Sequence, residues 1–352
     1  MALYGGNFRV LVAASEGATP GTATDLATTD VVVRVRGAAD EITVTPNHPF
    51  DNENSKHATG DHGKDQSLVL ESTANIDFSV RWSASDAYGT DPSTEPAHYG
   101  FAKACGLATQ DYTTTGVGLQ DRMSADEATL SIWVVDIQGG AASPTGVAMK
   151  FKGCIGDMTL SAENSPAPIM ASYAFQGVFT DEVDLANGAL PAYVGTAVED
   201  ALAHMWTNYA CTVHSDTLNI SAWSLTTGNS IEMVRDQSSD TGVSHFAIVD
   251  KNPRLQINPL RVAVATEDPY AVITGNAVAP ITFLQGAGSS VAKFKLYFPN
   301  TQLISNGQAL REGLRGFDRT YKLLRNEMPG AAAIYSHMAD ESMFNIVQGA
   351  VA

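Results

Sequence analysis

The densest group of residues able to do chemistry lies in the polar segment 46–66, PNHPFDNENSKHATGDHGKDQ. It mixes histidines with carboxylates, which borderline or hard metal ions accept as ligands. The spacing matches no standard zinc site, and Asp51 to Lys56 lacks the glycine of a calcium-binding loop. We therefore interpret the segment as a solvated loop. The residues considered as ligands are His48, Asp51, Glu53, His57, Asp61, His62 and Asp65.

The rest of the sequence holds no motif of enzymatic chemistry. It contains no Walker loop, no GxGxxG after a strand, no GxSxG and no HExxH. Asp126 and Glu127 are adjacent in a turn-like stretch and do not form a facing acid–base pair, although such pairs can also come from distant strands. We therefore expect no catalytic residue, no metal, no cofactor and no enzymatic activity.

The three cysteines, Cys105, Cys154 and Cys211, are widely spaced. Their number and spacing give neither a disulfide framework nor a CxxC pair. We expect three small buried hydrophobic residues in a reducing compartment.

Charge limits the partners of this chain. Its 352 residues include 38 acidic and 21 basic side chains, a net charge of −17, and 44% hydrophobic residues. This composition is globular, and the acidic excess repels nucleic acid, so binding to the DNA backbone is excluded as a leading function. The sequence shows neither a convincing signal peptide nor an apolar run of about 18 residues. We expect a soluble protein that stays in a cytoplasm, with no membrane partner.

Alternation of apolar and polar residues dominates the chain and predicts a mainly β fold. The clearest case is Ile76 to Trp82, and Val147 to Lys152 and Met158 to Ala162 are expected as two separate strands. Short helices are predicted at Pro96 to Ala108 and at Thr266 to Gly275. Aromatic residues in or beside the strands are expected as core anchors rather than a sugar-stacking platform. These anchors are Trp82, Trp133, Phe151, Tyr173, Phe175, Trp223, Phe294 and Tyr321.

The two halves of the chain share a pattern. MKFKGCIGDMTL at Met149 to Leu160 aligns with AKFKLYFPNTQL at Ala292 to Leu303, and similar elements flank both segments in the same order. A loop-like stretch, DEVDLANGALPAYVG, separates the halves near residues 180 to 195. We therefore expect two tandem domains, residues 1–190 and 191–352.

Four segments resemble tail tube proteins of long-tailed bacteriophages. Asp216 to Pro259 (DTLNISAWSLTTGNSIEMVRDQSSDTG followed by IVDKNPRLQINP) has that family's strand, Gly-Asn turn and Pro-x-apolar-x-apolar strand. Glu267 to Gly275 resembles its short helix, and Phe283 to Leu303 its glycine-turn hairpin. Gly146 to Phe179 resembles its strand, glycine-rich turn and Phe-x-Gly ending. The resemblance covers most of residues 66–325 and departs from the family in size, because many members carry one tube domain.

The resemblance implies a β-sandwich-like or half-barrel domain with one flanking helix, present twice. In this family the inner strands of a ring of subunits join into one closed barrel, and the rings stack through a long loop. The loop at 46–66 matches the stacking loop by its position between two strands. Its candidate stacking residues are Phe50, Asp51, Glu53, Lys56, His57, Asp61, His62 and Lys64.

The resemblance also implies a place and partners. The protein would be made and assembled in the cytoplasm of a host bacterium and would end in the virion tail, beside a tape measure, a tail terminator and distal tail proteins. Six domains with about four inner strands each would give roughly 24 strands, wide enough for one DNA duplex. Three two-domain chains would then form a homotrimer ring with pseudo-sixfold symmetry, and a homohexamer is the alternative. We expect an acid-lined lumen through which DNA passes without specific binding.

Other functions compatible with a β-rich chain make different predictions. A β-sandwich virion or surface module that binds a receptor or carbohydrate would explain the strands and tryptophans, and would form a discrete oligomer. A β-rich hydrolase is disfavoured by the missing motifs.

Overall fold

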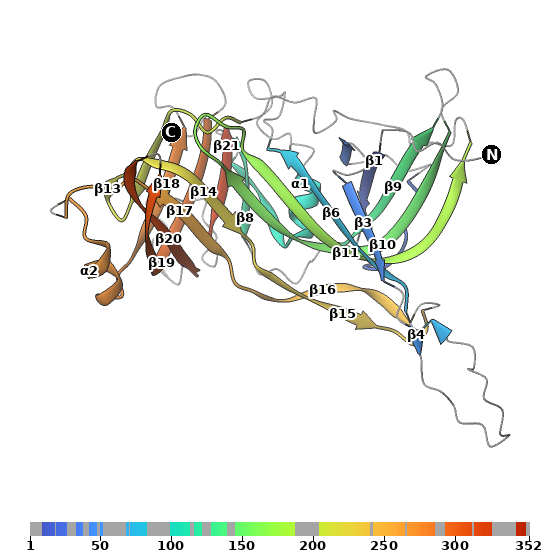
Figure 1. The fold of residues 1–352 in the computed structure, drawn as a ribbon. Helices are drawn as coiled ribbons and strands as arrows, with labels where there is room; N and C mark the ends of the chain where they lie inside the picture. The colour runs from blue at the N-terminus through green and yellow to red at the C-terminus, as the bar shows by residue number, and fades with distance from the viewer. Residues whose placement is uncertain are drawn as a thin grey trace, which may run out of the picture.

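The computed structural model shows a mainly β protein with large antiparallel sheets and, in the part of the chain that it describes, two short helices (Figure 1). It describes residues 9–17, 19–26, 33–37, 42–47, 50–51, 68–69, 71–82, 99–112, 116–121, 128–138, 145–186, 204–239, 242–264, 266–285, 293–311, 313–325 and 343–349. No helix in these ranges is long and apolar enough to cross a membrane. The expected boundary between the halves falls mostly on residues 187–203, outside the described residues.

The strands fall into two sets that follow one another along the chain. The first set, called the first repeat, consists of β1 (Arg9–Ser15), β2 (Val33–Gly37), β3 (Ile42–Asn47), β4 (Phe50–Asp51), β5 (Leu68–Val69), β6 (Thr73–Arg81), α1 (Tyr99–Ala104), β7 (Leu107–Tyr112), β8 (Gly116–Asp121), β9 (Leu130–Gln138), β10 (Thr145–Ala162) and β11 (Met170–Leu185).

The second set, called the second repeat, is followed by one more strand, β21 (Asn345–Gly349). The second repeat consists of β12 (Tyr209–Val213), β13 (Asp216–Thr217), β14 (Ile220–Thr226), β15 (Asn229–Arg235), β16 (Val243–Lys251), β17 (Arg254–Pro259), α2 (Pro269–Thr274), β18 (Val278–Gln285), β19 (Lys293–Arg311) and β20 (Leu314–Leu324).

Both repeats pair their strands in the same order. The first has β3–β6–β11–β10 with β9, β1 and β2 continuing from β10. The second has β14–β17–β20–β19 with β18, β12 and β13 continuing from β19. A hairpin follows the first strand of each series, β4–β5 or β15–β16, and one helix precedes β9 or β18. The two repeats therefore share one topology, with β7 and β8 added in the first.

One pairing joins the repeats into a single sheet. The end of β10 pairs with β14, with Thr159 opposite Thr226 and Ala162 opposite Trp223. The result is a continuous antiparallel series of eight strands, β3–β6–β11–β10–β14–β17–β20–β19, four from each repeat (Figure 1). Side branches leave this series at β10 and β19, and no pairing among the described strands returns to β3, so a single chain forms no closed barrel.

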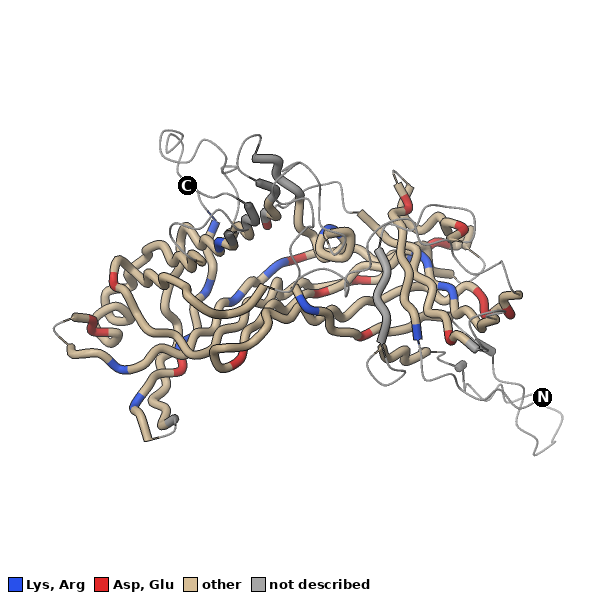
Figure 2. The backbone as a smooth tube through the Cα atoms, turned by 90° about the horizontal axis from the view of Figure 1, so that it is seen from above, with Lys and Arg blue, Asp and Glu red and all other residues tan. Residues whose placement is uncertain are grey.

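The C-terminal strand ties the repeats together a second time. β21 pairs with β19 through Lys293 to Tyr297 and with β8 of the first repeat through Val117 to Gln120. The described body is elongated, with the repeats side by side along it, and both signs of charge occur over its whole length (Figure 2).

The first repeat corrects one expectation about its strands. Val147 to Lys152 and Met158 to Ala162 belong to one long strand, β10, whose register shifts between Lys152 and Ile155. Gly153 in this irregularity has φ +57°, a left-handed conformation that glycine adopts without strain. The helices α1 and α2 lie within the two predicted helical segments.

The core lies on one face of the eight-stranded sheet. Alternation along β6 buries Ile76, Phe78 and Val80. The Phe78 ring stacks on Tyr173 at 5.2 Å between centroids and meets the edge of Phe101 from α1 at 4.9 Å. All eight aromatic residues proposed as core anchors are buried: Trp82, Trp133, Phe151, Tyr173, Phe175, Trp223, Phe294 and Tyr321.

Phe78→Ala tests this packing. Removing a buried phenylalanine leaves a cavity, so we expect the free energy of unfolding to fall by about 3–5 kcal/mol, measured by urea denaturation. Val249→Ala is the control, because Val249 is 57% exposed and its truncation should change stability by less than about 0.5 kcal/mol. Equal effects of the two substitutions would contradict the assignment of Phe78 to the core.

Candidate assembly site: the polar sheet face and the junction between the repeats

The face of the eight-stranded sheet opposite the core is polar and exposed, except where the β15–β16 hairpin covers Ile155 and Val178. Residues that pair across strands point to the same face, so the registers define rows of side chains that cross the sheet. One row crosses seven strands from β6 to β19. It consists of Ser79, Ser172, Thr159, Thr226, Arg254, Lys322 and Gln302.

Hydroxyl groups dominate the middle of this row. The Ser79 and Ser172 hydroxyls lie 2.8 Å apart, and those of Thr159 and Thr226 lie 3.4 Å apart across the junction between the repeats. A hollow in this face, lined by Asp77, Asp157 and their hydroxyl neighbours, spans β3, β6, β11 and β10. We call the surface the polar face, defined by Thr43, Thr45, Asn75, Asp77, Ser79, Arg81, Asp157, Thr159, Ser161, Met170, Ser172, Ala174, Gln176, Ser224, Thr226, Arg254, Gln256, Gln302, Ser305, Asp318, Thr320 and Lys322.

The polar face carries balanced charge, although the chain has a large acidic excess. Partial burial raises the pKa of Asp77. The acidic excess of the sequence therefore lies elsewhere in the chain. The charged residues of the face are Asp77, Asp157 and Asp318 against Arg81, Arg254 and Lys322.

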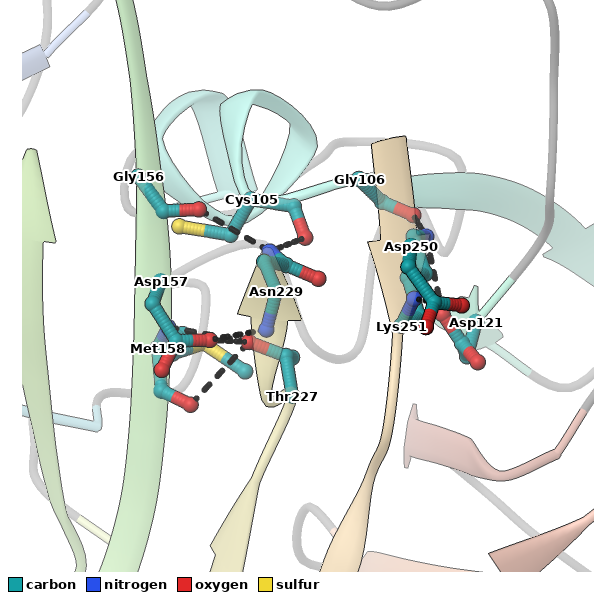
Figure 3. A network of polar contacts seen from close by, with 10 residues as sticks. All are labelled: Cys105, Gly106, Asp121, Gly156, Asp157, Met158, Thr227, Asn229, Asp250 and Lys251. Atoms are coloured by element: carbon teal, nitrogen blue, oxygen red, sulfur yellow. Dashed lines mark hydrogen bonds and ion pairs between the residues drawn. The ribbon is translucent and has the colours of Figure 1, made fainter. Parts of the chain in front are cut away.

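Below the polar face, a network of polar contacts fixes β14 against β10 (Figure 3). The Asp157 carboxylate accepts hydrogen bonds from the Thr227 hydroxyl and from the Asn229 backbone N–H, the latter at 3.0 Å. The Thr227 hydroxyl in turn accepts from the Met158 N–H at 3.0 Å. These bonds satisfy backbone and side-chain groups where β14 ends and the β15–β16 hairpin begins.

The hairpin of the second repeat is anchored on the first repeat at both of its ends. At the start of β15, the Asn229 amide nitrogen donates to the Cys105 carbonyl at 2.8 Å and to the Gly156 carbonyl at 2.9 Å. At the end of β16, the Lys251 ammonium donates to the Gly106 carbonyl and lies 3.0 Å from the Asp121 carboxylate. Two carbonyls that follow α1 are therefore held by side chains from the other repeat (Figure 3).

Burial makes the pair of Lys251 and Asp121 energetically important. The two side chains are 6% and 1% exposed. Burial raises the pKa of Asp121, and the neighbouring Lys251 charge opposes that rise. A buried carboxylate that loses its ammonium partner keeps the cost of burial and loses much of the compensating attraction.

The body of the hairpin also packs on the first repeat. Val243 and Phe246 form an apolar cluster with Ile155 of β10 and Val178 of β11. The backbones come so close that a Cβ atom on Gly153 would lie 2.7 Å from the His245 Cα. A glycine is thus required at this point both for its backbone angle and for the contact.

The structure describes only two of the eight candidate stacking residues. Of the candidate stacking residues, Phe50 and Asp51 form β4, and Glu53, Lys56, His57, Asp61, His62 and Lys64 lie outside the described residues. The β15–β16 hairpin occupies the same position in the second repeat as the predicted loop in the first, and the sequence analysis did not single it out. Two alternating stretches around the turn at Asp236 to Gly242 were the available signal.

The cysteines and tryptophans offer no exposed chemistry. Cys105, Cys154 and Cys211 are buried free thiols, and burial raises the pKa of each, to about 12 for Cys211. Within the described ranges, no group of three or more His, Cys, Asp and Glu residues is placed to hold a metal ion. The tryptophans Trp82, Trp133, Trp206 and Trp223 are all buried, so none presents its ring for sugar stacking.

Comparison of the sequence with protein-family models finds no match, and comparison with curated proteins finds no significantly similar relative.

Lys251→Met tests the buried anchor of the hairpin. Leaving Asp121 buried without its partner should lower the free energy of unfolding by about 3–5 kcal/mol near neutral pH. The control is Arg235→Met, because Arg235 is 71% exposed in its ion pair with Glu71 and its loss should cost less than about 1 kcal/mol. The double variant Lys251→Met/Asp121→Leu should recover much of the loss, and a failure to recover any would assign the effect to packing.

The same variant should depend on pH in a defined direction. An acid whose folded pKa is raised stabilises the fold below its unfolded pKa, and this contribution is lost as pH rises through the folded pKa. Removing Lys251 raises the folded pKa of Asp121 further, so the loss relative to wild type should be smaller at about pH 5.5 than at about pH 8. Urea denaturation at both values measures the difference.

Proposed function

We propose that this protein is a structural virion protein whose copies join into rings that stack into a hollow tail tube for phage DNA. The proposal rests on the sequence resemblance to tail tube proteins and on one structural observation. That observation is the continuous sheet of eight strands, in which each repeat supplies four strands in the same order. In a tube, such a sheet would form part of the wall and would contribute two repeating units to it.

The size of this segment suits a ring of three chains. Eight strands from each chain, spaced by about 4.8 Å and tilted by about 40°, give a circumference of roughly 150 Å. The backbone diameter is then about 48 Å, which leaves roughly 35–40 Å between side chains for a duplex about 20 Å wide. A homotrimer with pseudo-sixfold symmetry follows, and a homohexamer remains the alternative.

The polar face is the surface we assign to the lumen. It presents hydroxyl and amide groups and balanced charge rather than the acid-rich lining expected from the sequence. Without a cluster of positive charge it offers DNA phosphates no strong binding site, and its hydroxyl groups are hydrated. We propose that DNA slides over this face without specific binding.

The remaining roles follow from the resemblance. The segment between β3 and β6 is proposed to contact the adjacent ring, and a tape measure, a tail terminator and distal tail proteins are the proposed partners. Assembly would take place in the cytoplasm of the host bacterium.

Negative-stain electron microscopy of the concentrated protein tests the proposal. Rings and hollow tubes with regular striations are expected, and end-on averages should show three chains with six similar lobes. Discrete compact particles that form neither rings nor tubes, even with an added tail initiator complex, would favour the rival module that binds a receptor or carbohydrate.

Changing the charge of the polar face tests its assignment to the lumen. The triple variant Ser79→Lys/Ser172→Lys/Ser224→Lys adds positive charge to neighbouring strands, so DNA should be retained and phage infectivity should fall by 10-fold or more at low salt. Val249→Lys, on the exposed side of β16, is the control. Tubes of normal shape with unchanged infectivity would show that the polar face does not line the lumen.

A further inference from the structure

We propose that the free edge of β19, from Leu303 to Arg311, pairs with the free edge of β3 in a second copy of this chain. This inference rests on the proposed function and names the surfaces through which one copy recognises the next. It follows from a contact already present within the chain, the pairing of β10 with β14.

β10 shows how the last strand of a repeat is covered. Along one edge, β9 pairs with β10 from Thr145 to Cys154, and β14 then pairs with the same strand from Thr159 to Ala162. Along the opposite edge, β11 pairs with nearly the whole strand. The last strand of the first repeat therefore receives the first strand of the second repeat.

β19 has the same position in the second repeat, with one neighbour missing. β18 pairs with it from Lys295 to Gln302, as β9 does with β10. Beyond Gln302, the described strands pair with β19 only on its other edge, through β20. Among the residues that the structure describes, the place that corresponds to β14 is thus open over Leu303 to Arg311.

β3 provides the complementary edge. It is the first strand of the first repeat, as β14 is of the second, and it pairs with β6 from Ile42 to Asn47. No described strand lies on its other edge, where the Arg9 side chain donates to the Ile42 carbonyl at 2.8 Å; β14 uses the equivalent edge to reach β10. One chain therefore carries both halves of the contact at opposite ends of its eight-stranded sheet.

Exposed apolar side chains support an interface at the β19 end. The exposed residues there are Ile304 at 45%, Leu310 at 73% and Leu314 at 58% on the β19–β20 hairpin, and Tyr270 at 51% on α2. The two helices also differ in how many of their residues are buried. α1 buries Tyr99, Phe101, Ala102 and Ala104, whereas α2 buries Pro269 alone.

The lower burial of α2 is explained if the repeat that would pack beside it belongs to a second copy of the chain. The second repeat holds the end of α1 through Asn229 and Lys251, whereas the described hydrogen bonds at the end of α2 come from within the second repeat itself. A second copy of the first repeat, placed where the second repeat lies relative to the first, would approach α2 and the hairpin. Exposed apolar groups of this kind mark interaction sites.

The contact is heterologous, because it joins two different edges. Heterologous contacts generate closed rings when the rotation between copies closes and filaments when it does not. Pairing both edges also removes the unpaired backbone groups that make free edges prone to aggregation.

Cross-linking tests the seam in the full-length chain. Thr43→Cys chains and Ile304→Cys chains are mixed, assembled and treated with a short bis-maleimide, which tolerates a small error in register. The mixture should give covalent dimers. The double variant, with both cysteines in one chain, should give a ladder that ends at trimer. The native thiols are buried, so the unsubstituted protein should give no ladder.

The controls separate this contact from other contacts. Val249→Cys mixed with Thr43→Cys should give no product, because Val249 lies on the β15–β16 hairpin away from both edges. Dimers from either single variant alone would mean that like edges pair, and would overturn the proposal.

Microscopy of the same samples separates failure of the seam from failure of the proposed function. Rings or tubes without the β3–β19 cross-link would overturn the seam and leave the tube role intact. Neither assemblies nor cross-links, with each variant folded by its melting temperature, would overturn both.

Discussion

The pairing of β10 with β14 is the contact on which the rest of the structure depends. Over only Thr159 to Ala162, it converts two separate four-stranded units into one sheet and sets the rows of side chains that cross it. A strand end buried between two units cannot leave its polar groups without partners. Asp157, Thr227 and Asn229 supply those partners, and they fix the point at which β14 turns away into the hairpin.

The hairpin makes this short junction rigid. The pairing alone covers few residues, but Lys251 and Asn229 bond to the carbonyls after α1, and Phe246 packs on Ile155 and its neighbours. The β15–β16 hairpin is thus held by hydrogen bonds at its base and by apolar packing along its length. The relative position of the repeats is therefore set by several independent contacts.

The distribution of charge separates the net composition of the chain from the chemistry of its surfaces. A net charge of −17 suggests an acidic lining, yet the polar face balances three acids against three bases among many hydroxyl groups. Net charge acts at long range, whereas the chemistry of a surface in contact with a partner depends on the groups within a few ångströms. The two properties reside in different parts of the molecule.

The sequence by itself determined the local structure. Alternation placed β6 and its buried face, helix-start signals placed α1 and α2, and the shared Lys-Phe-Lys segments identified β10 and β19 as counterparts. It failed for β1, because both faces of that strand are buried and its residues do not alternate. It also divided β10 in two, since an irregularity at Gly153 breaks the pattern without ending the strand. Only the tertiary structure decided which strands join the repeats, where the second hairpin lies and which charges share a face. These depend on contacts between residues far apart in the chain, such as Asn229 with Cys105, and no local pattern encodes them.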